Sequence, residues 1–114
     1  MPNTDDISIT TLVGIFMLGS SRAAWLENKY MKVFVRKAFH NLDGVCEHTF
    51  DIANVTVFPN YHKQGYFRNL MQYAESLGRT IYVESINNPD LKSMLSKNGY
   101  TIDKSGYNAY KRVK

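Results

Sequence analysis

Two long stretches of alternating apolar and polar residues, joined by a short turn, constrain the fold of this chain more than any other feature. The first spans Tyr30–His40 and the second spans Val45–Phe58. Side chains of a strand alternate between its two faces, so a period of two predicts strands. The turn Asn41–Gly44 ends in a glycine, which suits the left-handed backbone of a hairpin turn. We therefore predict a long antiparallel hairpin, with either burial of both faces of its second strand or a β-bulge near residues 52–53, where the apolar phase changes.

The segments on either side of this hairpin predict helices, one more strand and a second hairpin. Apolar residues at helical spacing after Asp5 or Asp6, a candidate cap, predict a first helix that Gly19–Ser21 breaks. Proline at a first helical position and glycine just past a helix end mark the later boundaries. The predicted order of helices and strands gives a mixed α/β fold with a strand–helix–strand unit at its centre. The further elements are a short helix over Arg22–Asn28, a helix over Gly65–Leu77, a strand over Thr80–Ile86, a helix from Asn88 to Gly99, and a hairpin of Tyr100–Asp103 with Tyr107–Val113.

Length and composition predict one soluble domain over residues 1–114. The chain is 44% apolar and 21% charged, which is too apolar for a disordered protein. One cysteine excludes an internal disulfide and suits a reducing compartment. The polar, acidic start is unlike a secretory signal, and the apolar run that follows is too short to span a membrane. We expect a cytoplasmic protein. Its net charge of +4 favours polyanionic partners, although a solvated basic surface explains the charge equally well.

The segment Phe58–Arg68 joins a central strand to the clearest helix and carries the chemistry. The first N–H groups of a helix have no partner within it, and the helix dipole adds positive potential there. Such an end binds anions and suits a pyrophosphate. Gly65 lets a ligand approach the backbone closely, while His62, Lys63 and Arg68 add donors or positive charge. An ordinary strand-to-helix turn is the competing interpretation.

Two motifs at the right order and spacing resemble the coenzyme A signatures of the GNAT superfamily, the acetyl-coenzyme A-dependent N-acyltransferases. Val57–Met71 is similar to the family's Val-x-Pro-x-Tyr-x-x-x-Gly segment and its following helix. The second signature is a strand, an Asn, a short helix and a Gly-aromatic pair. It reads here as Ile81–Val83, Asn88, Leu91–Leu95 and Gly99–Tyr100. Short GNAT-like chains of this sort also resemble ones found in bacteriophages.

The resemblance implies an α+β fold with a mixed, mostly antiparallel central sheet that helices flank and whose two central strands splay apart. It implies that acetyl-coenzyme A is the co-substrate and lies in the gap between these two strands. His62 and Phe67 depart from the residues that the family usually carries in its loop, and the family's first strand and one helix are reduced or missing. The cofactor-binding residues that the resemblance implies are Val55, Val57, His62, Lys63, Gln64, Gly65, Tyr66, Phe67, Arg68 and Asn88.

The resemblance also suggests catalytic residues for direct transfer between thioester and amine in one complex. The amine must lose a proton before it attacks. Asp51 stands where the histone-acetylating branch of the family carries its Glu, and Glu84 on the neighbouring strand is the second candidate. The family often protonates the leaving thiolate with a Tyr, where this chain has Leu95. Tyr100 is a candidate to replace this tyrosine as the acid that protonates the thiolate.

Two functions from different classes remain open at this stage. The first is an N-acetyltransferase acting on an amine of a small molecule or protein. The second is a catalytically degenerate GNAT-fold module that binds protein or nucleic acid, which the loss of the Tyr favours. Nucleic acid is open but not favoured as a partner, no membrane partner is expected, and the chain is expected to be a monomer or a homodimer. We expect no metal, because His40, Cys46 and His48 lack a fourth ligand.

Overall fold

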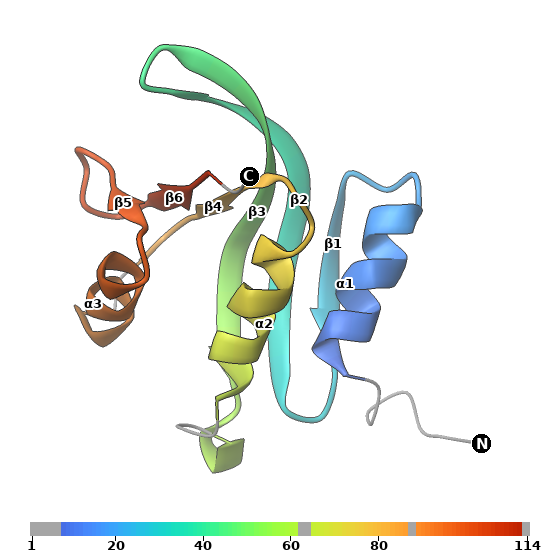
Figure 1. The fold of residues 1–114 in the computed structure, drawn as a ribbon. Coiled ribbons are helices and arrows are strands. Elements are labelled where there is room, and N and C mark those ends of the chain that lie inside the picture. The colour runs from blue at the N-terminus through green and yellow to red at the C-terminus, as the bar shows by residue number, and fades with distance from the viewer. Residues whose placement is uncertain (1–7, 62–64, 87–88, 113–114) are drawn as a thin grey trace.

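The computed structural model describes residues 8–61, 65–86 and 89–112 and contains a six-stranded sheet with helices against it (Figure 1). The strands lie in the order β1-β2-β3-β4-β6-β5, and every neighbouring pair is antiparallel except β3 and β4. This is the predicted mixed, mostly antiparallel α+β sheet. The elements are α1 (Ile9–Leu18), β1 (Ala23–Glu27), β2 (Met31–Leu42), β3 (Val45–Val57), the 3-10 turn η2 (Pro59–Tyr61), α2 (Tyr66–Glu75), β4 (Thr80–Val83), α3 (Pro89–Lys97), β5 (Thr101–Ile102) and β6 (Ala109–Lys111).

The long hairpin predicted from the alternation is confirmed as β2 and β3. The two strands pair from Leu42 with Val45 down to Met31 with Val57. Phe34 pairs with Asn54, but the next residue, Val35, pairs with Ile52. Ala53 is therefore an extra residue in β3, so the predicted bulge is confirmed and accounts for the change of apolar phase.

The predicted strand–helix–strand unit is β3, α2 and β4, and its two strands are parallel. Their pairing covers only four residues of each strand, from Thr49 with Thr80 to Ile52 with Val83. Beyond Ile52, β3 continues to Val57 while the chain after Val83 turns away toward α3. The central strands are thus splayed, as predicted, and the bulge lies where they part.

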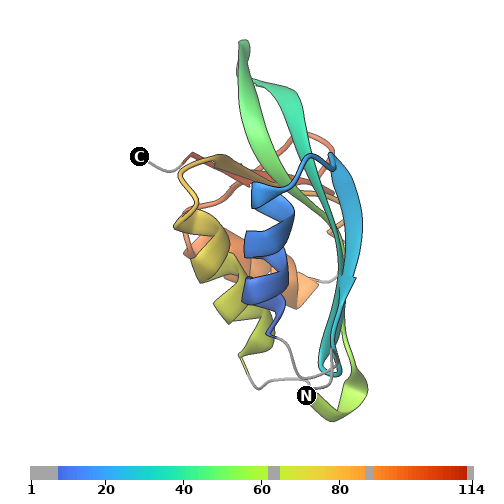
Figure 2. The same cartoon turned by 90° about the vertical axis from the view of Figure 1, so that its right-hand side faces the viewer.

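All three helices lie on one face of the sheet, as the view in Figure 2 shows. We call this the helix face and the opposite side the open face. Register partners share a face, so Val33, Val35, Phe50, Ile52 and Ile81 all point to the helix face and are fully buried there. Leu70 and Ala74 of α2 and Val13 of α1 complete this core. The next residues along the same strands therefore point to the open face.

The sequence-based prediction was wrong at the start of the chain. Residues 23–27 are not a helix but the edge strand β1, paired with β2 from Ala23 with Arg36 to Glu27 with Lys32. Leu26 packs toward the core and Trp25 points away from it, so the period is two. The first helix is capped by Ser8, whose side chain accepts a hydrogen bond from the Thr11 N–H, and Asp5 and Asp6 lie outside the described residues.

The later elements are confirmed in type but are shorter than predicted. The strand expected to reach Ile86 ends at Val83, and the final hairpin is limited to β5 and β6. In the described part of the chain, no helix has the length and apolar character needed to cross a membrane.

Candidate active site

A slot opens where β3 and β4 part. It has a volume of about 300 Å³. Its lining comes from the β3 bulge, the end of β4 and the two helices that follow these strands. Phe67 and Leu91 belong to helices on the helix face, whereas Asn54 and Glu84 point to the open face. The slot therefore connects the two faces of the sheet. Its lining residues are Ile52, Ala53, Asn54, Val55, Phe67, Val83, Glu84, Ser85 and Leu91.

The amino terminus of α2 lies beside the slot and has the properties of an anion site. Gly65 precedes the helix with a positive φ of 83°, so a residue with a side chain would be strained there. Among the residues that the structure describes, no side chain caps this end, and the Asn69 N–H donates a hydrogen bond to the Gly65 carbonyl. A side-chain carbon built on Gly65 would meet no atom within 4 Å. The end of α2 is therefore open to a ligand.

The predicted cofactor-binding residues divide into three groups. Val55 and Phe67 line the slot. Tyr66, by contrast, stacks on Tyr30 with ring centroids 4.6 Å apart, and Arg68 is exposed on α2 and borders a small cavity toward α3. Val57 is half-buried at the end of β3 and is not among the residues that line the slot. His62, Lys63, Gln64 and Asn88 lie outside the described residues.

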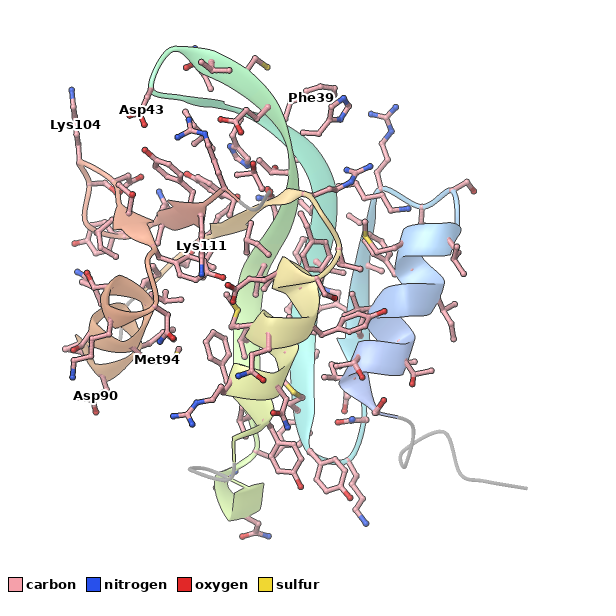
Figure 3. The ribbon with its side chains drawn as sticks, in the orientation of Figure 1. Phe39, Asp43, Asp90, Met94, Lys104 and Lys111 are labelled. Atoms are coloured by element: carbon pink, nitrogen blue, oxygen red, sulfur yellow. The ribbon has the colours of Figure 1, made fainter. Side chains whose placement is uncertain are left out.

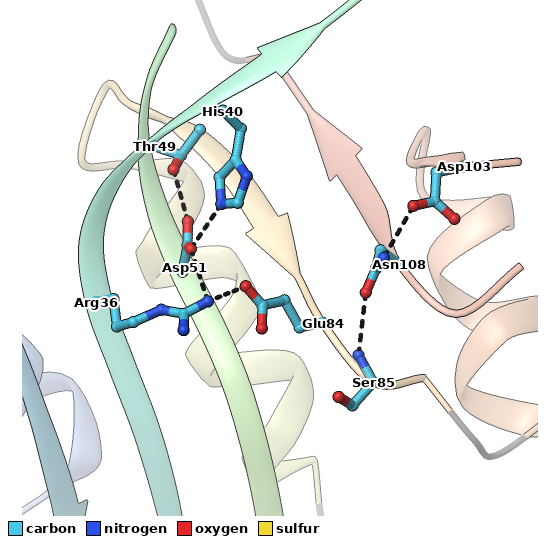
Figure 4. A network of polar contacts seen from close by, with 8 residues as sticks. All are labelled: Arg36, His40, Thr49, Asp51, Glu84, Ser85, Asp103 and Asn108. Carbon is cyan, nitrogen blue, oxygen red and sulfur yellow. Dashed lines mark hydrogen bonds and ion pairs between the residues drawn. The ribbon is translucent and has the colours of Figure 1, made fainter. Parts of the chain in front are cut away.

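Asp51 is the centre of a polar network on the open face (Figure 4). Its carboxylate is fully buried, and both oxygens accept hydrogen bonds. Thr49 Oγ1 donates to one oxygen at 2.5 Å. Arg36 Nη2 and His40 Nε2 lie 3.2 and 2.7 Å from the other. A carboxylate with this many partners is well suited to holding neighbouring side chains in place.

Arg36 links this buried carboxylate to the slot. Its Nη2 also binds Glu84 Oε1, and Glu84 lines the slot with about a quarter of its side chain exposed. The Arg36 Nε is buried and has no hydrogen-bond partner among the described residues. The structure thus brings the two predicted carboxylates, Asp51 and Glu84, together through one guanidinium, with only Glu84 at the slot.

His40 extends the network toward β4. Its ring stacks on Tyr82 with centroids 3.8 Å apart, so ring packing and the bond to Asp51 fix its orientation. Burial raises the pKa of Tyr82, and the negative charges of Asp103 and Asp51 raise it further. The Tyr82 phenol therefore stays protonated at physiological pH and packs against His40 as a neutral aromatic ring.

The three groups His40, Asp51 and Glu84 also have the composition of a cation site, with ligand atoms within 4.8 Å of one another. The Arg36 guanidinium contacts both carboxylates, so it already supplies the positive charge there. His48, a residue considered for zinc, instead packs its ring 4.1 Å from that of Phe39.

Tyr100 and Leu95 lie between α2 and α3 rather than in the slot. Both are buried and border a cavity of about 30 Å³ together with Glu75 and Arg68. The Tyr100 hydroxyl has no hydrogen-bond partner among the described residues. Burial raises its pKa far above the usual value, and the negative charge of Glu75 adds to this. Lys111 of β6 holds Glu75 at 2.5 Å, and Figure 3 shows this lysine reaching toward α2.

Sequence reasoning missed several residues of the site. Arg36 lies within the predicted strand Tyr30–His40 and carries no motif signal, yet its spacing with His40 puts both on the open face. Asn54 and Ser85 line the slot without any motif signal. Ser85 has a positive φ of 59°, which belongs to the chain's departure from β4. Only the parting of two strands, a tertiary feature, brings them together.

Known structures share this fold at low sequence identity. No protein-family model and no curated protein matches the sequence. AtaT complexed with acetyl-methionyl-tRNAfMet matches with a TM-score of 0.58 and 9% identity over 73% of this chain and 62% of that chain. A mutant AtaT toxin bound to the C-terminus of the antitoxin AtaR and acetyl-CoA matches with a TM-score of 0.54 and 9% identity over 72% and 57%. The KacTA–DNA complex matches with a TM-score of 0.53 and 11% identity over 72% and 57%.

These matches show the fold, which is that of the GNAT acetyltransferases. The chain spans about three fifths of the length of the solved chains that it matches. The resemblance to GNAT proteins that the two sequence motifs indicated is therefore confirmed at the level of fold. The resemblance to bacteriophage chains finds no support in these matches.

Proposed function

We propose that this chain transfers an acetyl group from acetyl-coenzyme A to an amine, by direct attack in a ternary complex. The observation that carries the proposal is the slot between β3 and β4, which joins the helix face to the open face beside an uncapped helix end. A long, narrow co-substrate with an anionic end and a reactive thioester needs this combination. The amine would then approach the thioester from the open face.

The residues present suit acetyl-coenzyme A, which supplies the acetyl thioester when it is bound. The pantetheine arm, with its amides, would lie along β3 beyond Ile52, where β4 no longer pairs with it. Val55 and Val57 are the β3 residues assigned to this contact, and Phe67 closes the slot from α2. Ala53, the extra residue of the bulge, lines the slot, and a backbone N–H there would hold the thioester oxygen.

The amino terminus of α2 would hold the pyrophosphate. The N–H groups of Phe67 and Arg68 precede the first intrahelical hydrogen bond, and the left-handed Gly65 leaves space beside them. His62, Lys63 and Gln64 are assigned to the same contact from the sequence motif, as is Asn88 near the pantetheine. These assignments are parts of the proposal that the binding experiment below addresses.

Glu84 and Asp51 have different roles in removing the proton from the amine. Glu84 lines the slot, so it is the carboxylate assigned to accept the proton. Asp51 is fully buried with both oxygens bonded, so it acts as a positioning residue that orients Arg36 and His40. This reverses the order of the two candidates that the sequence motif suggested.

The leaving thiolate departs without a tyrosine in this proposal. Tyr100 is the residue assigned from the sequence, but its buried hydroxyl borders the cavity between α2 and α3. Ser85 lines the slot and offers a hydroxyl there. A thiol of pKa about 8.5 is a tolerable leaving group without an acid.

The acceptor is an amine of a small molecule, a protein or a nucleic-acid-linked group. The similar AtaT and KacTA structures hold tRNA, an antitoxin peptide or DNA, which is consistent with macromolecular partners. We expect a cytoplasmic protein that acts as a monomer or a homodimer. The alternative is a GNAT-fold module that binds a partner without catalysis, which the missing tyrosine favours.

Calorimetric titration with acetyl-coenzyme A tests the proposal, using two matched glycine variants. Gly65 and Gly78 flank α2, both have a positive φ near 80°, and both open onto free space. Gly65→Glu and Gly78→Glu therefore impose similar backbone strain, but only the first adds a negative charge to the proposed phosphate site. We expect binding by the native chain and the Gly78 variant, and at least a tenfold loss in the Gly65 variant. A folded native chain that binds no acetyl-coenzyme A would favour the non-catalytic module.

A further inference from the structure

An aromatic and basic platform lies on the open face, outside the slot and the polar network. It consists of Trp25 on β1 and Phe34 and Lys32 on β2. Trp25 is the only tryptophan of the chain, and it is 54% exposed. Its ring lies 5.0 Å from that of Phe34, which is its register partner, and Lys32 Nζ lies 4.6 Å from the Trp25 centroid. An exposed tryptophan held by two neighbours is a preformed flat surface.

The platform borders the open-face end of the slot. Phe34 pairs in register with Trp25 on one side and with Asn54 on the other, so these three side chains form one row across β1, β2 and β3. Asn54 lines the slot. A group stacked on Trp25 would therefore lie two strands away from Asn54, with Phe34 of β2 between them.

We propose that this platform binds a nucleobase of a single-stranded nucleic acid. Bases stack on exposed aromatic rings of sheet surfaces, and this stacking needs no particular base sequence. The Lys32 ammonium, which lies over the Trp25 ring, can contact a phosphate of the bound strand. The binding goes beyond the proposed acetyl transfer and does not depend on it.

The distribution of exposed apolar residues favours a nucleic acid over a protein partner. Ile15 and Leu18 of α1 and Phe39 of β2 are also exposed, but they belong to the helix face. Val45 at the turn between β2 and β3 and Tyr107 before β6 are exposed as well, and neither lies near β1 in the sheet. Trp25 is therefore not part of a broad apolar patch of the kind that protein interfaces use. The net charge of +4 attracts a polyanion, although Glu27, the register partner of Lys32, weakens the local positive charge.

The single tryptophan makes a direct test possible with the unmodified chain. An eight-nucleotide single-stranded adenosine RNA is titrated into the protein while the Trp25 fluorescence is recorded, and the same-length DNA and a duplex serve as comparisons. We expect saturable quenching with either single strand and little with the duplex. Absence of quenching, or quenching by an acidic peptide but not by either single strand, would overturn the proposal. Acetyl-coenzyme A binding is measured separately by calorimetry, so failure of one proposal leaves the other testable.

Four variants, measured by anisotropy of a dye-labelled strand, assign the binding to these residues. Trp25→Ala should raise Kd about tenfold, while Trp25→Phe should retain most of the affinity. Lys32→Gln should weaken binding and reduce the slope of log Kd against log salt by about one. Glu27→Gln should tighten it. The matched control is Phe39→Ala, which removes an equally exposed ring (58%) from the other face. An effect of Phe39→Ala as large as that of Trp25→Ala would refute the assignment to the open face.

Discussion

Phe50 and Asp51 are adjacent on β3 and equally buried, yet they stand on opposite faces of the sheet and are buried by different means. Each has an exposed fraction of 0%. Phe50 points to the helix face and packs in the apolar core. Asp51 points to the open face, where Thr49, Arg36 and His40 surround its carboxylate with hydrogen bonds.

This comparison shows that burial alone does not say what a residue contributes. Apolar packing on the helix face stabilises the fold through removal of surface from water. The polar network on the open face only offsets the cost of burying a charge, and replacing such networks by apolar groups often leaves stability unchanged. The helix face should therefore govern stability, and the open face should govern chemistry at the slot.

The largest expected effect comes from Phe50→Ala. It removes a fully buried ring from the core and leaves a cavity, which typically costs about 3–5 kcal/mol. Thermal and urea unfolding should show this loss. The control is Phe39→Ala, because the Phe39 ring is exposed and should cost less than about 1 kcal/mol. Equal losses for the two variants would contradict the contrast between core and exposed positions.

Next in size is the effect of Glu84→Gln on turnover. If Glu84 accepts the amine proton, its loss should lower kcat by about 100-fold or more, equivalent to about 2.7 kcal/mol. Its partly exposed side chain predicts little change in the melting temperature. Turnover is measured with saturating acetyl-coenzyme A and an amine found to be an acceptor. Native turnover in the Gln variant would exclude this role for Glu84.

Asp51→Asn should have a smaller and mixed effect. The amide keeps the shape but replaces an acceptor oxygen by an NH₂ that faces either the Thr49 hydroxyl or the Arg36 guanidinium. We expect a loss of about 1–3 kcal/mol in stability and a fall in kcat smaller than that of Glu84→Gln. The reverse order of the two kcat values would return the base to Asp51 and make Glu84 the positioning residue.

The fold could be predicted to a large extent from local patterns, and the site only in part. The hairpin, its bulge at Ala53 and the parallel unit are set by side-chain period and turn residues, which act locally. The segment 22–28 was mistaken for a helix because a five-residue edge strand is too short for its period to be distinctive. The motif identified Gly65, whose left-handed backbone needs a glycine.

The parts of the site that sequence could not supply depend on contacts between distant segments. Arg36 meets Glu84 across 48 positions of sequence. The preference for Asp51 over Glu84 came from the resemblance, through the position of Asp51 relative to Gly65, and such a position says nothing of hydrogen-bond partners. Tyr100 belongs to the second motif, but the structure places it at the cavity between α2 and α3, which shares no lining residue with the slot.

The smallest expected effect, that of Tyr100→Phe, tests whether the cavity between α2 and α3 takes part in the chemistry at the slot. Near pH 7 this variant removes a buried hydroxyl that has no hydrogen-bond partner among the described residues, so stability should change by less than about 1 kcal/mol. Turnover should be unchanged if Tyr100 takes no part in thiolate departure. A sharp fall in kcat with unchanged melting would instead make Tyr100 the acid.

The same variant has a distinct signature at alkaline pH. Burial raises the pKa of Tyr100 in the folded chain above its value of about 10 in the unfolded chain. Below pH 10 both the folded and the unfolded chain keep the Tyr100 proton, so ionisation of Tyr100 does not lower the free energy of unfolding. Above pH 10 the unfolded chain loses the proton first, and the native chain is destabilised by up to about 1.4 kcal/mol per pH unit. Tyr100→Phe removes that loss, while Tyr82 and the other tyrosines titrate equally in both proteins. Urea unfolding at pH 9, 10 and 11 should therefore show that the free energy of unfolding of the variant rises relative to that of the native chain only above pH 10. Parallel plots of this free energy against pH would mean that the Tyr100 hydroxyl is in contact with water.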